Sequence, residues 1–459
     1  MHPNLKTVND VHGLRAGFLF VALALPVLAH AVDFGPNGEF SLTGFAEFTT
    51  TLQGSYCDNC QVAASGASRQ VRSSDAIIPG KRYGDATLTN WQVQPYLGYK
   101  RDIGGGYKVS ALLSQRWRQG TVNGVVDGTE TRYGGTVDVP DYWYEKNIAL
   151  SQEDWGSVRI GSMTTRSWSV ADYPYGTNVG LASAWSSSGA GYGMLGNAVR
   201  VGSPLFDVAE GDLFLEASYD AGNTSFARLK PAFWELYAQY HKGDLVVDVM
   251  LQDTKNGGPG AWGHAPFSAV TPFAADDIAL QYDGTGTGAQ LKGTQQNIAM
   301  VMARYQASSQ IEVSGGLRYN YWSGANSVYS TTTNWTTAFN ADFNTPAYTG
   351  YAASSYDVLL GARYRTGPWV LYAGMVHLGA ASTSNPSQRG QGNSALINTF
   401  GANYDFGRGF MFASTLGLVH YAYKGLAPLS MPGHAAFTNV DSRITQDGRW
   451  LTLGVVYAF

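Results

Sequence analysis

This sequence predicts an all-β fold, a transmembrane antiparallel up-and-down β-barrel of about sixteen strands, on three observations. Apolar residues recur at every second position in runs of about ten residues, the length that a tilted strand needs to cross a bilayer. The connections between these runs alternate between long and short. Charged residues make up only 14% of the chain, against about 25% in soluble domains, although the mean hydropathy is close to zero. A wall with one apolar and one polar face explains this combination.

Residues 1–31 are expected to be a signal peptide outside the fold. Lys6 and Arg15 come before the apolar run from Ala16 to Leu28, and small residues near Ala31 suit a cleavage site. The run is shorter than the ~20 residues of a membrane-spanning helix. No later stretch reaches that length without polar interruption, so residues 32–459 are predicted to form a single outer-membrane β-barrel domain.

The apolar alternation divides each run into a lipid-facing and a lumen-facing set, because successive strand side chains point to opposite faces. In the first run, Phe40, Leu42 and Phe48 alternate with Thr43 and Glu47. The predicted strands lie near residues 40–49, 91–100, 108–118, 142–151, 156–163, 197–204, 212–220, 232–241, 245–252, 294–306, 310–322, 354–365, 368–378, 395–405, 409–421 and 448–459.

The connections between these runs provide an independent test of the barrel. Short ones, such as 152–155 and 242–244, alternate with long ones, such as 53–87 and 253–293. Short periplasmic turns and long outer loops give this pattern, with both termini on the periplasmic side. A soluble β-solenoid or sandwich has no reason to alternate in this way.

The connection 164–196 is expected to fold into the lumen as a constriction loop. Loops longer than about 15 residues inside a compact fold are usually functional, and this one is rich in Trp, Tyr, Gly and Ser. Its aromatic residues either form a stacking surface for sugars and aromatic acids or pack the loop against the wall. These residues are Trp168, Tyr173, Tyr175 and Trp185.

Charged residues of the lumen-facing sets are the candidate pore lining, because a pore selects by diameter and by charge. We expect Arg159 and Arg200, which flank the loop, to face Asp172, its only carboxylate, with Arg116 and Arg118 nearer the outer mouth. The alternative is that individual arginines pair with neighbouring acids or hold the loop in place. The other candidates are Glu47, Glu145, Glu216, Glu235, Asp248, Arg304, Arg318, Arg363 and Arg365.

Cys57 and Cys60 lie in the first long loop, where an oxidising periplasm favours a structural disulfide. A c-type haem site needs His after the second Cys, but Gln61 stands there, and further zinc ligands are not nearby in the sequence. The scattered histidines show neither a catalytic motif nor metal-ligand spacing. We therefore expect no enzyme activity, metal or cofactor. The alternative is a barrel enzyme, a phospholipase or a protease. The net charge of -4 without a basic run argues against nucleic acid.

The end of the chain resembles the C-terminal assembly signal of outer-membrane barrels. Thr452, Gly454, Tyr457 and Phe459 form the pattern polar-x-Gly-x-x-aromatic-x-aromatic. The resemblance implies that the outer-membrane assembly machinery recognises this strand. An ordinary apolar strand that happens to end in Phe is the alternative.

Three further blocks resemble the trimeric general diffusion porins of Gram-negative bacteria, most closely the sixteen-stranded kind of beta-proteobacteria. They are Phe40–Glu47, Tyr144–Gly161 with Trp155-Gly-Ser-Val-Arg-Ile-Gly, and Gly196–Pro204. The resemblance implies a homotrimer in the cell outer membrane, in contact with lipid and lipopolysaccharide, that passes small hydrophilic solutes and ions by passive diffusion. The alternatives are a substrate-selective channel, or a non-conducting barrel that serves a partner protein as a sheath or adhesin.

Two departures from the family pattern put the selectivity in question. The acidic Pro-Glu-Phe-Gly motif of many constriction loops is absent, and Ala458 stands where a basic residue commonly precedes the final Phe. The resemblance therefore supports the architecture more strongly than the choice of solute.

Overall fold

A computed structural model describes residues 32–54, 86–118, 121–122, 125–126, 131–132, 135–136, 143, 145–176, 185, 194–220, 232–255, 295–323, 352–380, 382–383, 392, 394–422 and 447–459. The predicted signal peptide and the Cys57–Cys60 pair lie outside these residues.

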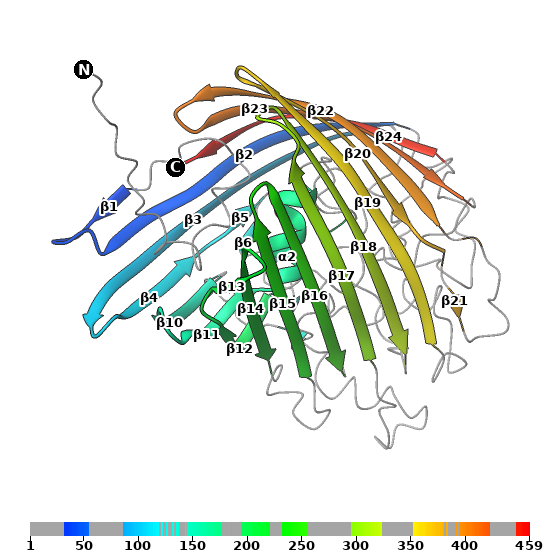
Figure 1. Ribbon diagram of the computed structural model, residues 1–459. Helices are drawn as coiled ribbons and strands as arrows, with labels where there is room; N and C mark the ends of the chain where they lie inside the picture. The colour runs from blue at the N-terminus through cyan, green and yellow to red at the C-terminus, as the bar shows by residue number, and fades with distance from the viewer. Residues whose placement is uncertain are drawn as a thin grey trace, which may run out of the picture.

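Sixteen antiparallel strands form a closed ring in the described part of the chain (Figure 1). Neighbours in the ring follow the order of the sequence, and β24 pairs with β2 to close it. The strands are β2 (Phe40–Gly54), β3 (Ala86–Gly104), β4 (Tyr107–Ser114), β10 (Glu145–Gln152), β11 (Gly156–Thr164), β12 (Met194–Gly202), β14 (Gly211–Asp220), β15 (Ala232–Lys242), β16 (Leu245–Lys255), β17 (Gln295–Gln306), β18 (Ile311–Ser323), β19 (Ala352–Thr366), β20 (Trp369–Leu378), β22 (Ala395–Gly407), β23 (Phe410–Tyr421) and β24 (Asp447–Ala458). The predicted fold class is confirmed.

Shorter elements accompany the ring. β1 pairs with the start of β2, β13 pairs with the start of β14, and two helical segments follow β11. They are β1 (Val32–Phe34), β5 (Trp117–Arg118), β6 (Thr121–Val122), β7 (Val125–Val126), β8 (Thr131–Arg132), β9 (Gly135–Thr136), β13 (Phe206–Val208), β21 (Ser382–Thr383), the α-helix α2 (Arg166–Val170) and the π-helix η1 (Ala171–Gly176). No helix of the described residues is long and apolar enough to cross a membrane.

The third predicted strand is divided into β4 and β5 by one proline. The pairing between β3 and β4 continues in the same register between β3 and β5. Pro95 lies at the break, opposite Gln115, whose N–H donates to the Pro95 carbonyl at 3.4 Å. Proline has no N–H to return this bond, so the hydrogen-bond ladder stops there and resumes at Trp117.

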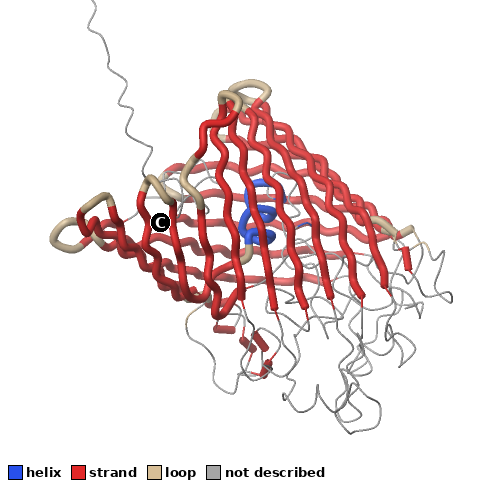
Figure 2. The backbone as a smooth tube through the Cα atoms, turned by 60° about the horizontal axis from the view of Figure 1, so that its bottom comes forward, coloured by secondary structure: helices blue, strands red, loops and turns tan. Residues whose placement is uncertain are grey.

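The connections confirm the two kinds of rim. The tight connections, such as Gly243–Asp244 and Gly367–Pro368, gather at one end of the barrel together with the C-terminus (Figure 2). We call this end the short-turn rim, and the end where the longer connections leave the strands the long-connection rim.

Side-chain exposure in the wall is the reverse of that in a soluble protein. Ile148 and Phe400 point outward and are 55% and 51% exposed, whereas Glu235 and Asp357 point inward and are 1% and 0% exposed. The outer face is therefore a continuous apolar surface and the inner face holds charged and polar groups. This is the arrangement of a barrel whose solvent outside is lipid.

The final residue completes the ring. Phe459 donates its N–H to the Gly44 carbonyl at 3.0 Å and accepts from the Gly44 N–H at 2.8 Å. The nearby Tyr457 ring stacks on Phe410 with centroids 4.4 Å apart. A Cβ at Gly44 would lie 2.7 Å from the Phe459 ring and 2.5 Å from the Gln94 carbonyl oxygen. Only glycine therefore lets the last residue approach β2 this closely.

We predict that Gly44→Ala destabilises the barrel by about 1 to 3 kcal/mol, the usual cost of an added methyl group that forces the backbone to shift. The loss should appear as a lower temperature at which the detergent-solubilised protein loses its compact migration in gel electrophoresis. Gly315→Ala is the matched control, because its Cβ would meet nothing closer than 3.5 Å. Equal midpoints for the two variants would contradict this account of the closure.

Candidate functional site

The candidate site is built around the connection between β11 and β12, residues 165–193, which we call the lumen loop. Its described part comprises residues 165–176, including α2 and η1, together with Trp185. Figures 1 and 2 both place the helical segments inside the ring of strands. The predicted inward folding of this connection is confirmed for these residues.

Arg166, the first residue of α2, forms a buried ion pair with the wall. Its Nε and Nη2 donate to the two carboxylate oxygens of Glu216 on β14, each at 2.5 Å. The guanidinium carbon also lies 5.2 Å from the ring centroid of Tyr237 on β15. Burial disfavours the charged guanidinium, but the attraction of Glu216 outweighs it and raises the pKa of Arg166 above its ordinary value. Arg166 is therefore a permanent positive charge fixed to the wall.

Glu235 on β15 caps the start of α2. Its carboxylate accepts the backbone N–H groups of Arg166 at 2.7 Å and Ser167 at 3.2 Å. Gln252 on β16 donates from Nε2 both to Glu235 at 2.5 Å and to the Ser167 hydroxyl at 2.8 Å. The first N–H groups of a helix have no partner within it, and here the barrel wall supplies that partner.

Arg200 and Arg159, the two arginines predicted to flank the loop, lie at its base. Arg200 donates from Nε to the Ser218 hydroxyl and from Nη2 to the Thr164 carbonyl, both at 2.8 Å. Its guanidinium is also 3.2 Å from Glu216. Arg159 donates to the Asn147 side-chain oxygen at 2.5 Å. Arg159 is thus tied to the neighbouring wall strand β10. Arg200 is tied to the wall and to Thr164, the last residue before the loop.

The side chains of several predicted residues lie outside what the structure describes. An encounter of Arg159 and Arg200 with Asp172 therefore stays a prediction. The side chains concerned are those of Arg118, Trp168, Asp172 and Tyr173.

Tyr175 in η1 makes the second attachment of the loop. Its hydroxyl donates to Asp248 Oδ2 on β16 at 2.5 Å. The other oxygen of Asp248 accepts from the Tyr237 hydroxyl at 2.6 Å and from Gln239 Nε2 at 2.8 Å. Burial, followed by the negative charge of Asp248, raises the pKa of Tyr175. The hydroxyl therefore keeps its proton, and with it this hydrogen bond, at neutral and mildly alkaline pH.

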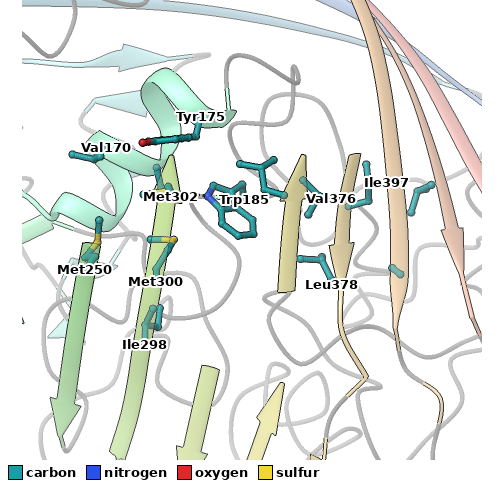
Figure 3. Packing of buried hydrophobic residues seen from close by; sticks show 14 of the residues in the cluster. Val170, Tyr175, Trp185, Met250, Ile298, Met300, Met302, Val376, Leu378 and Ile397 are labelled. Atoms are coloured by element: carbon teal, nitrogen blue, oxygen red, sulfur yellow. Dashed lines mark hydrogen bonds between the residues drawn. The ribbon is translucent and has the colours of Figure 1, made fainter. Parts of the chain in front are cut away.

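Trp185 makes the third attachment, against β17 and β18 (Figure 3). Its indole N–H donates to the Met302 sulfur at 3.3 Å. The guanidinium carbon of Arg318 lies 4.5 Å from the Trp185 ring centroid, and Arg318 also donates to the Trp185 carbonyl. Arg318 is held in turn by Asp357 at 2.7 Å. A Cβ at Gly316 would lie 2.9 Å from the Trp185 ring, so the glycine makes room for the indole.

Apolar residues on the inner wall form the seat of the loop. Ile298, Met300 and Met302 on β17 point inward and are buried together with Val170 and Tyr175 of the loop (Figure 3). The sequence contains a signal for this seat that alternation alone misses. The segment 298–302 reads Ile-Ala-Met-Val-Met, apolar on both faces, as expected of a strand that is covered on both sides.

The remaining predicted lining residues are distributed around the ring. Arg363 on β19 pairs with Glu312 on β18 at 2.8 Å. Arg116, after β4, and Glu145, at the start of β10, are both buried, 4% and 9% exposed. Glu47 lies on β2, opposite Val456 of β24. The sequence predicted a position in the lumen for Glu216, Glu235 and Asp248 but no specific role. It gave no prediction for Arg166.

The described residues contain no group of three or more His, Cys, Asp or Glu side chains placed to hold a metal ion. Their chemistry is that of a polar, charged passage with a loop attached to one side. The strands that hold the loop are β14 to β18.

Comparison with solved structures finds the same barrel. The anion-selective porin from Comamonas acidovorans has a TM-score of 0.52 and 12% identity, over 92% of this chain and 99% of the porin. The outer-membrane expressed OmpT of Vibrio cholerae has a TM-score of 0.51 and 11% identity, over 92% of this chain and 98% of OmpT. At such identities the likeness shows the fold alone, which is that of the bacterial porins.

Comparison of sequences gives one short match. The chitoporin of Vibrio furnissii is 34% identical over 86 residues, which make up 18% of this chain and only 23% of the chitoporin. No family model matches the chain.

We predict that Arg166→Met destabilises the folded barrel by about 3 to 5 kcal/mol, because it leaves Glu216 buried without its main partner. Adding Glu216→Gln to this variant should restore part of the loss by removing the unpaired charge. The thermal unfolding midpoint in detergent, followed by circular dichroism, measures both effects.

Lys242→Ala is the control for this experiment. It removes an exposed ion pair with Glu210, in which the two atoms are 2.9 Å apart, and such pairs contribute about 0 to 1 kcal/mol. A midpoint for Arg166→Met as high as that of the control would show that the ion pair does not stabilise the fold.

Proposed function

We propose that this chain is an outer-membrane porin, a water-filled channel through which small hydrophilic solutes and ions diffuse passively. One observation carries the proposal: a closed ring that is apolar outside and charged inside holds a loop in its lumen by three attachments to one wall. In this proposal, solutes pass along the strands that do not hold the loop. The solved structures that share the fold are porins, which supports the same function.

The charged groups at the loop suit a passive filter. Arg166, Arg200, Glu216 and Glu235 form a compact group of two positive and two negative charges. These groups are almost fully buried, so they would act on a passing solute through their electric field, which salt screens less for buried than for exposed charges. Such a passage favours polar and ionic solutes over apolar ones, and it requires neither cofactor nor energy source.

The proposal includes the location and assembly of the protein. Residues 1–31 would direct it out of the cytoplasm and be removed near Ala31, and the ending with Gly454, Tyr457 and Phe459 would direct its insertion into the outer membrane of a Gram-negative cell. The apolar outer face of the strands would then contact lipid, with lipopolysaccharide at the long-connection rim. A homotrimer follows from the resemblance of the sequence to trimeric porins.

A substrate-selective channel is the second candidate, and the match to the chitoporin favours it. The described loop aromatics provide no open surface for a sugar, because Tyr175 and Trp185 are both 0% exposed. General diffusion therefore remains the primary proposal.

Single-channel recording in planar bilayers tests the function. A general porin should give ohmic conductance that closes in steps of three. A small conductance blocked by one oligosaccharide would favour the selective channel instead. Complete absence of current from correctly folded protein would overturn the proposal and favour the sheath or adhesin.

The attachment of the lumen loop at Trp185 can be tested in the same recordings. Trp185→Ala removes the attachment to Met302 and Arg318, so the loop should move more freely and the open-channel current should become noisier. Trp369→Ala, on the apolar outer face at the short-turn rim, where the ring is 42% exposed, should leave the noise unchanged. The same noise in both variants would argue against an attachment at Trp185.

A further inference from the structure

Three arginines and one carboxylate meet on the inner wall near the short-turn rim. Arg304 lies on β17, Glu312 on β18, and Arg363 and Arg365 on β19. Glu312 and Arg363 face each other across the strand pair. Tyr364, between the two arginines of β19, points outward and is 39% exposed, so both arginines point inward.

Within the described residues, this group holds three positive charges and one negative charge. Glu312 accepts from Arg363 at 2.8 Å and lies 3.9 Å from Arg304. The Arg365 side chain makes no hydrogen bond or ion pair with any described residue. Asp248 lies on β16, the strand next to that of Arg304. It already accepts hydrogen bonds from two tyrosine hydroxyls and a side-chain amide. Among the described residues, one carboxylate thus contacts two of the three guanidinium groups.

Hydrogen-bond donors of the same group are buried and unused. The Nε atoms of Arg304, Arg363 and Arg365 have no partner, and the same is true of the Ser314 hydroxyl. Arg363 and Ser314 are 5% and 8% exposed. A buried donor without an acceptor costs free energy, so this arrangement suits a ligand that brings acceptor oxygens and negative charge.

One row of the wall beside these donors is formed by glycines. Ser314 pairs with Arg304 on one side and with Gly361 on the other, and Gly361 pairs with Gly374 of β20. The next residue in the row is Thr399 of β22, whose buried hydroxyl also has no partner. Two glycines therefore separate two unused hydroxyl groups.

The group also adjoins the lumen loop. The guanidinium carbon of Arg304 lies 5.9 Å from the ring centroid of Tyr175, which fixes η1 to Asp248. A solute that passes the loop therefore meets these arginines on the short-turn side of it.

We propose that Arg304, Ser314, Arg363 and Arg365 form a binding site for one oxyanion, the carboxylate, phosphate or sulfate group of a passing solute or the free inorganic ion. The inference rests on the proposed channel function and adds to it a place where anionic solutes pause. Guanidinium groups bind such oxygens through paired N–H donors.

Inhibition of chloride current by inorganic phosphate tests the site. In the full-length protein, phosphate added on the short-turn side should reduce the current in a saturable manner. Arg365→Gln should weaken this inhibition about fivefold, the effect of removing one unit charge about 4 Å from the ion in water. This substitution leaves no carboxylate without its ion-pair partner, because Arg365 has no such partner among the described residues. Glu312→Gln should strengthen the inhibition.

Arg101→Gln, an exposed arginine near the short-turn rim on β3, is the matched control and should inhibit like the parent. Chloride current that phosphate does not inhibit, or inhibition unchanged in Arg365→Gln, overturns the site and leaves the channel proposal intact. Absence of any current overturns the channel proposal instead. Calorimetric titration of the solubilised barrel with inorganic phosphate then decides the site alone, and a lack of phosphate binding overturns it.

The same recordings distinguish the sources of the anion. Stronger inhibition by a phosphorylated sugar or a dicarboxylate than by inorganic phosphate assigns the site to organic solutes. Stronger inhibition by inorganic phosphate assigns it to the free ion. Either order supports the site, whereas equal inhibition by an uncharged sugar would overturn its dependence on charge.

Discussion

The pairing of β24 with β2 is the constraint on which the rest of this structure depends. A sheet with an apolar outer face cannot leave an edge of unpaired N–H and C=O groups in a lipid environment, so the first and last strands must meet. The exchange of hydrogen bonds between Gly44 and Phe459 completes this closure at the short-turn rim. Once the ring is closed, every inward residue shares one lumen, and charges far apart in the sequence become neighbours.

Charged residues buried in the lumen need partners of opposite charge or hydrogen-bond donors. Glu216 and Glu235 are almost completely buried, and a buried carboxylate without partners is strongly destabilising. Arg166, Arg200 and the first N–H groups of α2 supply those partners. The wall therefore stabilises the loop and the loop neutralises the wall, so that neither would keep its arrangement without the other. The arginines near Glu312 lack this mutual compensation, and for that reason they point to a ligand.

Alternation and connection length predicted most of the fold, because both are local properties. The strand positions and the inward direction of Arg318 and Arg363 follow from the two-residue period. Departures came from particular residues. Pro95 divided one strand because it has no N–H, and the two-residue period does not explain why the segment 298–302 of β17 is apolar on both faces. The loop covers that second face.

The sequence by itself determined the number of strands, the face that each residue occupies and the rim at which each connection lies, because these depend on neighbours along the chain. The tertiary structure alone decided which charges meet. Arg166 and Glu216 are 50 positions apart, and Tyr175 and Asp248 are 73 apart. Such pairs depend on the register of several strands and on the path of the loop across them, and no local pattern in the sequence specifies that path.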